Sequence, residues 1–206
     1  IRKCTTGRMT GPCPLSTPSA FDLSLIVVNP KSETHRTMKT SQSHPLQIKS
    51  VIAGNGEIGL IFCPGKKQTG TYGDPWDRDL ETDLQAIREW GADALVSLIE
   101  DHEFQKLQVS ELGPKAEAMG LEWHHLPIRD RDIPDDKFEA TWRCSGCRLR
   151  SLLRQGRKIV IHCKSGLGRT GTIAGRLMIE LGDTADAAIN AIRAARAYTG
   201  RHKIAK

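Results

Sequence analysis

The stretch KIVIHCKSGLGRTG, residues 158–171, decides the fold of this chain. It opens with Ile159–Ile161, a β-branched run between a glycine-bearing turn and polar residues, which is typical of a buried strand. Beyond the stretch, Ile173, Leu177 and Leu181 recur at helical spacing. The sequence therefore predicts a strand, then a glycine-rich loop, then a helix that starts near residue 172.

The loop between this strand and this helix is suited to binding an anion. The first turn of a helix has unpaired backbone N–H groups, and Gly166 and Gly168 allow the backbone to turn toward one point. Arg169 adds a planar guanidinium that matches two oxygens of a phosphate. The same N–H groups, the helix end and Arg169 would lower the pKa of the Cys163 thiol, which would then be a thiolate at neutral pH. The loop therefore predicts a nucleophilic cysteine that accepts a phosphoryl group.

The pattern His–Cys–five residues–Arg–Thr–Gly over residues 162–171 resembles the signature of cysteine-dependent protein tyrosine and dual-specificity phosphatases. The resemblance implies that Cys163 is the nucleophile and that Arg169 clamps the phosphate. It also implies that Thr170 helps the thiolate to leave and that His162 holds the loop and tunes the thiol. It implies no metal and no other cofactor. The phosphate-binding loop would consist of Lys164, Ser165, Gly166, Leu167, Gly168 and Arg169.

A charged, proline-bounded loop over residues 127–135 is expected to supply a proton to the leaving oxygen of a phosphate ester. It follows a predicted strand that should lie near the cysteine, and it offers Asp130 and Asp132. Residues 123–128 followed by Asp130 resemble the acid-loop region of the kinase-associated phosphatase family, dual-specificity enzymes that act on a phosphothreonine of cyclin-dependent kinases. The likeness covers about residues 60–198. It makes Asp130 the expected general acid, with Asp132 as the alternative.

Alternating strands and helices predict an α/β fold with a central, mostly parallel sheet of four or five strands, flanked by helices on both faces as in protein tyrosine phosphatases. Asp135 is expected to start a helix, residues 100–103 to form a polar turn, and Gly113–Pro114 to break a helix. Apolar runs predict four further strands, at 46–53, 58–63, 94–99 and 121–126. Helical spacing predicts helices at 77–90, 104–119, 138–155 and 183–198.

The length of 206 residues favours one domain with appendages. Residues 1–45 are rich in Ser, Thr, Pro and basic residues, and they predict a disordered or extraneous N-terminal segment in which Met38 is an alternative start. Residues 46–200 would form the dual-specificity phosphatase-like domain, and residues 201–206 a basic tail. This tail does not match the loop and helix that follow the last predicted helix in the kinase-associated phosphatase family.

The net charge of +6 suits an anionic substrate. It would suit nucleic acid equally, but no dense Lys/Arg run has interleaved aromatic residues, so we expect no nucleic-acid partner. No apolar run approaches the ~20 residues of a membrane span. Because a reactive thiol at Cys163 needs a reducing compartment, we expect a cytoplasmic protein.

Two other groups of residues could suggest a metal site. Cys144 and Cys147 form a lone CxxC without two further ligands at a matching spacing, so we expect them to be buried helix residues. His124 and His125 are adjacent on a predicted strand, so their side chains should face opposite ways and should not bind a metal together.

These patterns favour a phosphoprotein phosphatase that hydrolyses phosphotyrosine, phosphoserine or phosphothreonine esters through a phosphocysteine intermediate, with a phosphorylated protein or peptide as its partner. A phosphoinositide or small-molecule phosphatase is an alternative, because Lys164 follows the cysteine as it does in lipid phosphatases of the superfamily; Leu167 stands where those usually have a second lysine. Another alternative is a protein that binds phosphate groups but does not hydrolyse them. A rhodanese is disfavoured because its loop is one residue shorter. The oligomeric state stays open.

Overall fold

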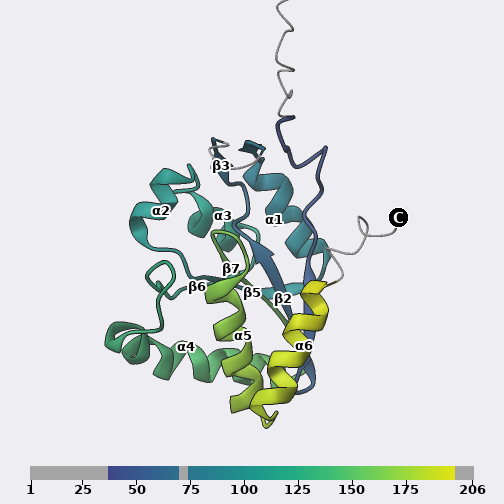
Figure 1. The fold of residues 1–206 in the computed structure, drawn as a ribbon, viewed down its shortest axis with the longest axis vertical. Helices are drawn as coiled ribbons and strands as arrows, with labels where there is room; N and C mark the ends of the chain where they lie inside the picture. The colour runs from purple at the N-terminus through teal and green to yellow at the C-terminus, as the bar shows by residue number, and fades with distance from the viewer. Residues whose placement is uncertain (1–36, 70–73, 198–206) are drawn as a thin grey trace, which may run out of the picture. The chain divides into compact units, whose positions relative to one another are not determined.

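A five-stranded sheet forms the centre of the fold, in the order β1-β2-β7-β5-β6 (Figure 1). β2, β7, β5 and β6 are parallel to one another, and β1 is antiparallel to β2. The computed structural model describes residues 37–69 and 74–197, so most of the predicted N-terminal segment and the whole basic tail lie outside the described residues. The strands are β1 (Lys49–Ala53), β2 (Gly56–Phe62), β5 (Ala92–Ser97), β6 (Glu122–His125) and β7 (Lys158–Cys163).

Helices cover both faces of this sheet, as predicted. α1 (Leu80–Glu89) and α3 (Leu112–Ala118) pack against β5, β6 and each other. α4 (Asp136–Arg154), α5 (Gly168–Glu180) and α6 (Ala185–Ala197) pack against β7, β2 and β1 (Figure 1). No helix in the described part of the chain is both long and apolar enough to cross a membrane. The predicted α/β class with a mostly parallel sheet is confirmed.

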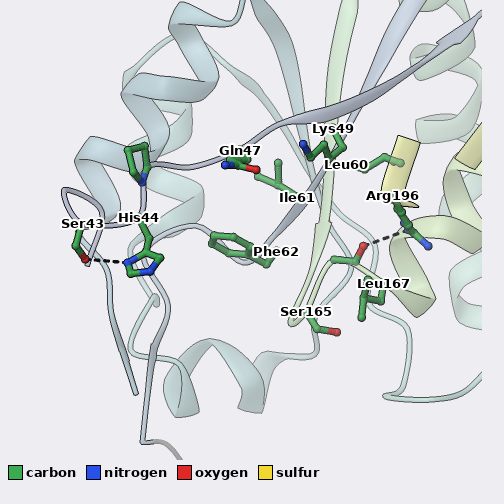
Figure 2. A pocket seen from close by; sticks show the side chains of 12 residues that line it. Ser43, His44, Gln47, Lys49, Leu60, Ile61, Phe62, Ser165, Leu167 and Arg196 are labelled. Atoms are coloured by element: carbon green, nitrogen blue, oxygen red, sulfur yellow. Dashed lines mark hydrogen bonds between the residues drawn. The ribbon is translucent and has the colours of Figure 1, made fainter. Parts of the chain in front are cut away.

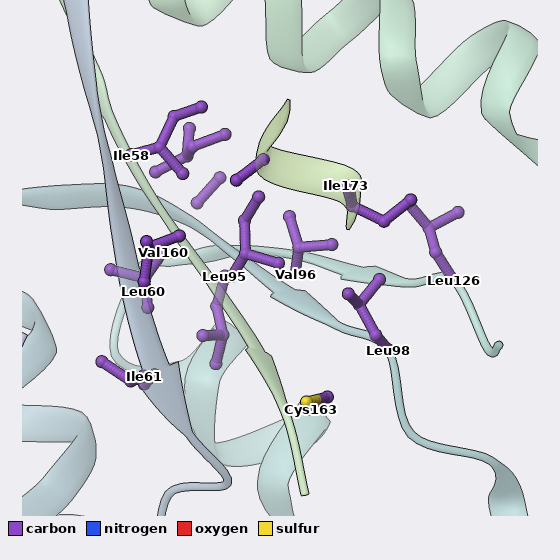
Figure 3. Close-up of a cluster of buried hydrophobic side chains, with 14 of the residues drawn as sticks. Ile58, Leu60, Ile61, Leu95, Val96, Leu98, Leu126, Val160, Cys163 and Ile173 are labelled. Carbon is purple, nitrogen blue, oxygen red and sulfur yellow. The ribbon is translucent and has the colours of Figure 1, made fainter. Parts of the chain in front are cut away.

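The core lies between the sheet and its helices. The three apolar residues of β7, Ile159–Ile161, are fully buried, as the sequence predicts for a central strand. Figure 3 shows Leu95 and Val96 of β5 beside Val160, with Cys163 at the lower end of this apolar cluster. Each fully buried aliphatic side chain contributes about 1.5–3 kcal/mol. The strand that ends in Cys163 is therefore held rigidly from both sides.

The connection after β5 differs from the prediction. The residues expected to form a polar turn instead begin α2 (Asp101–Lys106), because the Glu103 carboxylate accepts a hydrogen bond from the backbone N–H of Glu100 (3.0 Å) and caps the helix. The helix break lies before Leu112 rather than at Gly113–Pro114. Both of those residues fit within the first turn of α3, where a proline lacks an N–H that would be unpaired anyway.

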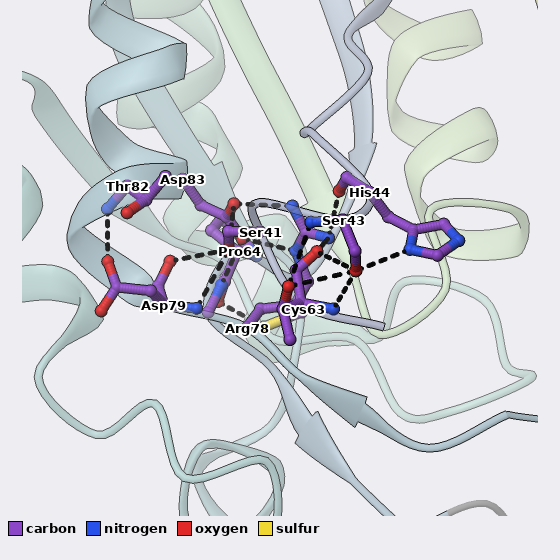
Figure 4. Close-up of polar contacts among 11 residues, drawn as sticks. Ser41, Ser43, His44, Cys63, Pro64, Arg78, Asp79, Thr82 and Asp83 are labelled. Carbon is purple, nitrogen blue, oxygen red and sulfur yellow. Dashed lines mark hydrogen bonds and ion pairs between the residues drawn. The ribbon is translucent and has the colours of Figure 1, made fainter. Parts of the chain in front are cut away.

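The predicted boundary at residue 45 is also wrong, because residues 37–45 pack on the domain (Figure 4). The hydroxyl of Ser41 is buried and donates to Asp83 in α1 (3.0 Å). Arg78 donates to the backbone carbonyl of His44 (2.6 Å). These contacts join the segment before β1 to α1, and no local sequence pattern encodes them.

The lone CxxC lies on the solvent side of α4. The buried face of this helix includes Phe138, Trp142 and Leu149, whereas Cys144 and Cys147 are exposed. The expectation that both cysteines are buried is wrong, because their positions fall opposite the apolar stripe of the helix. His124 and His125 lie on opposite faces of β6: the ring of His125 stacks on that of Trp123, and His124 bonds to Glu122.

Candidate active site

Cys163 is the last residue of β7, and α5 starts at Gly168, four residues earlier than predicted. The thiol is buried, with the residue 2% exposed. Burial raises the pKa of the Cys163 thiol, but the nearby Thr170 hydroxyl and the backbone N–H groups of Thr170, Gly166 and Ser165 favour the thiolate and hold the pKa below its ordinary value. The loop amides therefore favour a thiolate, as the sequence suggests.

Gly166 is the glycine that shapes this loop. Its φ is +73°, and a Cβ atom there would lie 2.5 Å from the carbonyl oxygen of Ile61 in β2. Gly168, which the sequence analysis paired with it, has no atom within 4 Å of a Cβ position. The carbonyl of Gly166 accepts a hydrogen bond from Arg196 of α6 (3.1 Å). The loop is thus braced against β2 on one side and α6 on the other.

Arg169 lies in the first turn of α5 and is held by a carboxylate that the sequence analysis missed. Its Nη1 donates to Glu103 Oε2 (2.5 Å) and to the carbonyl of Ile128 (3.0 Å), and its Nη2 donates to Glu103 Oε1 (3.0 Å). Burial raises the pKa of Glu103, but hydrogen bonds from Arg169 and from the Glu100 N–H outweigh it, so its pKa is lowered. Glu103 therefore stays ionised and orients the guanidinium.

The two predicted acids lie on the same pocket wall but differ in their contacts. Asp130 Oδ1 is 3.2 Å from Nη2 of Arg169, and its side chain is 57% exposed. Asp132 accepts from the backbone N–H of Ile133 (2.9 Å) and lies 3.4 Å from Arg129. Of these two acids, Asp130 is therefore the one that contacts Arg169.

His162 is completely buried behind the loop. Its Nε2 lies 2.7 Å from the hydroxyl oxygen of Ser97, which also accepts a hydrogen bond from Trp123 Nε1 (2.9 Å). Burial lowers the pKa of His162 to about 3, so the imidazole is neutral at physiological pH. Ser97 ends β5, the neighbour of β7, and this strand pairing brings Ser97 beside His162. The pairing is a feature of the tertiary structure, so the sequence analysis did not identify Ser97.

A pocket of about 480 Å³ contains the cysteine. Thr170 and His162 lie behind its wall and are fully buried. The candidate residues on its wall are Asp130, Cys163, Lys164, Ser165, Gly168 and Arg169, and they are joined there by Lys66 from the loop after β2.

Residues 70–183, more than half of the chain, match the family model described as "Polymorphic toxin system, DSP-PTPase phosphatase". The chain belongs to this family. It is 30% identical over 131 residues to cyclin-dependent kinase inhibitor 3 of Homo sapiens and 29% identical over 127 residues to that of Rattus norvegicus. Each match covers 62% of this chain and 56% of the relative, so the chain spans about half the length of these curated relatives.

Solved structures agree with this DSP-PTPase membership. A kinase associated phosphatase, crystallised with its catalytic-site cysteine substituted by serine, has a TM-score of 0.65 and 25% identity, with 78% of this chain and 89% of that chain covered. Tk-PTP in its active form has a TM-score of 0.50 and 26% identity, with 72% and 84% covered. The predicted dual-specificity phosphatase superfamily and its fold are confirmed.

A second hollow, of about 470 Å³, is lined by Ser165 and Leu167 of the phosphate-binding loop and by Arg196 of α6 (Figure 2). Ser165 lines both this hollow and the catalytic pocket. Leu167 is 60% exposed and lines the second hollow with Gly166. Of the predicted phosphate-binding residues, Leu167 and Gly166 therefore lie outside the wall of the catalytic pocket, and they could reach a phosphate there only through their backbone.

Proposed function

We propose that this protein is a phosphoprotein phosphatase that hydrolyses phosphate monoesters of tyrosine, serine or threonine through a phosphocysteine intermediate. The observation that carries the proposal is the pocket in which a buried thiol with a lowered pKa lies beside a buried, carboxylate-anchored arginine. A thiolate is a strong nucleophile, and a fixed guanidinium stabilises the charge that develops on the phosphoryl oxygens.

In the first step, Sγ of Cys163 attacks phosphorus, and the bond from phosphorus to the ester oxygen breaks. Asp130 donates a proton to the leaving oxygen. Arg169 and the loop N–H groups bind the equatorial oxygens of the phosphoryl group. Among the described residues, Nε of Arg169 makes no hydrogen bond, so it is available as a donor to one of these oxygens.

In the second step, water attacks the phosphocysteine, Asp130 accepts the proton, and the phosphorus–sulfur bond breaks. The Thr170 hydroxyl, which lowers the pKa of Cys163, also stabilises the thiolate as it leaves. His162 takes no proton in either step, because its pKa of about 3 keeps it neutral; it holds the strand end through Ser97. Neither step uses a metal ion.

A protein or peptide substrate in the cytoplasm fits these features. A thiolate nucleophile needs a reducing compartment. The pocket is open at the surface and its wall carries Lys66, Arg131 and Lys164, which attract an anionic segment. The alternative of a phosphoinositide substrate rests on Lys164, which lines the pocket. The alternative of binding without turnover is disfavoured by the convergence of Cys163, Arg169 and Asp130 on one pocket.

The central test is hydrolysis of p-nitrophenyl phosphate. We expect Cys163→Ser to lower kcat/KM by at least about 10³-fold, because an alcohol is not ionised at pH 7. Cys147→Ser, which changes an exposed cysteine on α4, is the matched control and should keep full activity. Turnover that survives in Cys163→Ser, or that a chelator abolishes, would contradict the proposal.

The role of Asp130 is tested by two leaving groups. Asp130→Asn should lower kcat about 10²-fold with a phosphoserine peptide, whose alkoxide needs a proton, and only a few-fold with an activated aryl phosphate. Asp132→Asn is the matched control and should change neither rate more than about twofold. An equal loss with both substrates in Asp130→Asn would assign the acid to another residue.

A further inference from the structure

Lys66 is a buried lysine on the wall of the catalytic pocket. It follows β2 in the chain and is 6% exposed. Its ammonium lies over two aromatic rings, 4.7 Å from the ring centroid of Phe62 and 4.3 Å from that of Trp76. Such cation–π contacts offset part of the cost of taking the charge out of water.

This lysine has no counter-ion within residues 37–69 and 74–197, whereas two of its cationic neighbours do. Lys67 pairs with Asp77 (2.9 Å), and Arg78 pairs with Asp83 (2.7 Å). No carboxylate of the described residues reaches Lys66. A buried charge without a partner is costly, and an anion that entered the pocket would remove part of that cost.

The charge state of Lys66 suits anion binding at neutral pH. Burial, together with the charges of Arg78 and Lys164, lowers the pKa of Lys66 to about 8, while the thiols of Cys63 and Cys163 act in the opposite direction. A group with this pKa is about nine-tenths protonated at pH 7. The ammonium is thus present at pH 7 and is lost as the pH rises through 8.

The transferred phosphoryl group does not need this lysine. In the mechanism proposed above, Arg169 and the N–H groups of the loop between β7 and α5 bind its equatorial oxygens. Lys66 comes from a different wall, after β2, and its pocket of about 480 Å³ continues past the loop to Gln68. A cation placed there meets a group next to the phosphate that Cys163 attacks.

We propose that Lys66 is a substrate-binding residue that selects phosphopeptides with a second anionic group, a carboxylate or a phosphate, beside the scissile phosphate. The proposal rests on the phosphoprotein phosphatase activity proposed above. It specifies the class of substrate and names a residue outside the cysteine loop that recognises it.

The test compares two phosphopeptides that differ only in a Glu or a Gln beside the phosphorylated residue. We expect the wild-type protein to have about tenfold higher kcat/KM for the Glu peptide at pH 7. Lys66→Met should reduce this ratio to about one. Lys67→Met removes a lysine at the next position, outside the pocket, and is the matched control that should keep the ratio. A third peptide, with a neighbouring phosphoserine, shows whether phosphate or carboxylate is the better second anion.

The wild-type protein also supplies a test without a substitution. The Glu-to-Gln ratio should fall as the pH rises from 7 to 9, because Lys66 loses its proton near pH 8 while the carboxylate and phosphate stay ionised. Lys66→Arg should keep the ratio constant over this range. A wild-type ratio near one, or an unchanged ratio in Lys66→Met, would overturn the proposal. Failure of p-nitrophenyl phosphate hydrolysis would instead overturn the phosphatase activity itself.

Discussion

Arg78 and Arg169 are both buried arginines that pair with a carboxylate on a helix, but the guanidinium of Arg78 is enclosed by protein whereas that of Arg169 borders a pocket. Arg78 donates through Nε and Nη2 to Asp83 (2.8 and 2.7 Å). Its Nη1 donates to the carbonyl of His44 (2.6 Å), in the segment before β1 (Figure 4). The side chains of the pair are 0% and 1% exposed. Each of the three nitrogens of this guanidinium donates a hydrogen bond to the protein.

Arg169 has a carboxylate of the same kind in Glu103, but it borders a pocket. One of its remaining contacts is the exposed carboxylate of Asp130, at 3.2 Å. Among the described residues its Nε has no acceptor. The two pairs show that a buried ion pair stabilises the fold when each nitrogen of the arginine donates to the protein, and forms part of a site when the arginine borders a pocket.

Of the substitutions in these two ion pairs, Arg169→Lys should cause the largest change in free energy. Lysine keeps the charge but loses the planar fork that binds two phosphoryl oxygens, so kcat/KM should fall about 10³-fold, equivalent to about 4 kcal/mol of transition-state stabilisation. Steady-state kinetics with p-nitrophenyl phosphate, on protein shown by circular dichroism to be folded, measures this loss. A loss of kcat/KM below tenfold would mean that Arg169 does not bind the phosphoryl group.

Arg78→Lys should act on stability instead. One ammonium cannot replace the four donors that Arg78 directs to Asp83, Thr40 and His44, so the free energy of unfolding should fall by about 3 kcal/mol. Urea denaturation followed by tryptophan fluorescence measures this change. The kcat/KM of the folded variant should stay within about twofold of the wild-type value. A catalytic loss as large as that of Arg169→Lys would break the comparison.

The smallest change in free energy should come from Glu103→Gln, which leaves Arg169 in place but removes the charge of its partner. We expect kcat/KM to fall about tenfold, because the guanidinium is less well oriented. The pKa of Glu103 is lowered in the folded protein, so its contribution to stability is present above the unfolded pKa of about 4.3 and is lost as the pH falls through the folded value. Unfolding curves at pH 7 and pH 4 should therefore differ less in Glu103→Gln than in the wild type.

The parts that the sequence predicted well are local. α4 was expected at 138–155 and spans Asp136–Arg154, and Asp135 caps it by accepting from the N–H of Phe138 (2.9 Å). The loop from Cys163 to Arg169 was found because its glycine, cysteine and arginine are adjacent in the chain. Periodicity and short motifs depend on neighbours in sequence, so one chain is enough to read them.

The errors have two origins. Cys144 and Cys147 were expected to be buried, but they lie opposite the apolar stripe of α4 that Phe138, Trp142 and Leu149 form, so their exposure follows from a local pattern. The packing of residues 37–45 depends on Arg78, which lies more than thirty residues further along the chain. That packing has no local signature.

The sequence by itself determined the class of fold, and it predicted Cys163 as the nucleophile, Arg169 as the phosphate clamp and Asp130 as the acid, since each prediction rests on residues close together in the chain. Only the tertiary structure decided which residues support them. Strand order places β7 between β2 and β5, so Lys66, Ser97 and Glu103, which follow or end the two flanking strands, meet around Cys163. Contacts between strand ends depend on how the sheet is assembled, and no spacing within a single segment encodes that order.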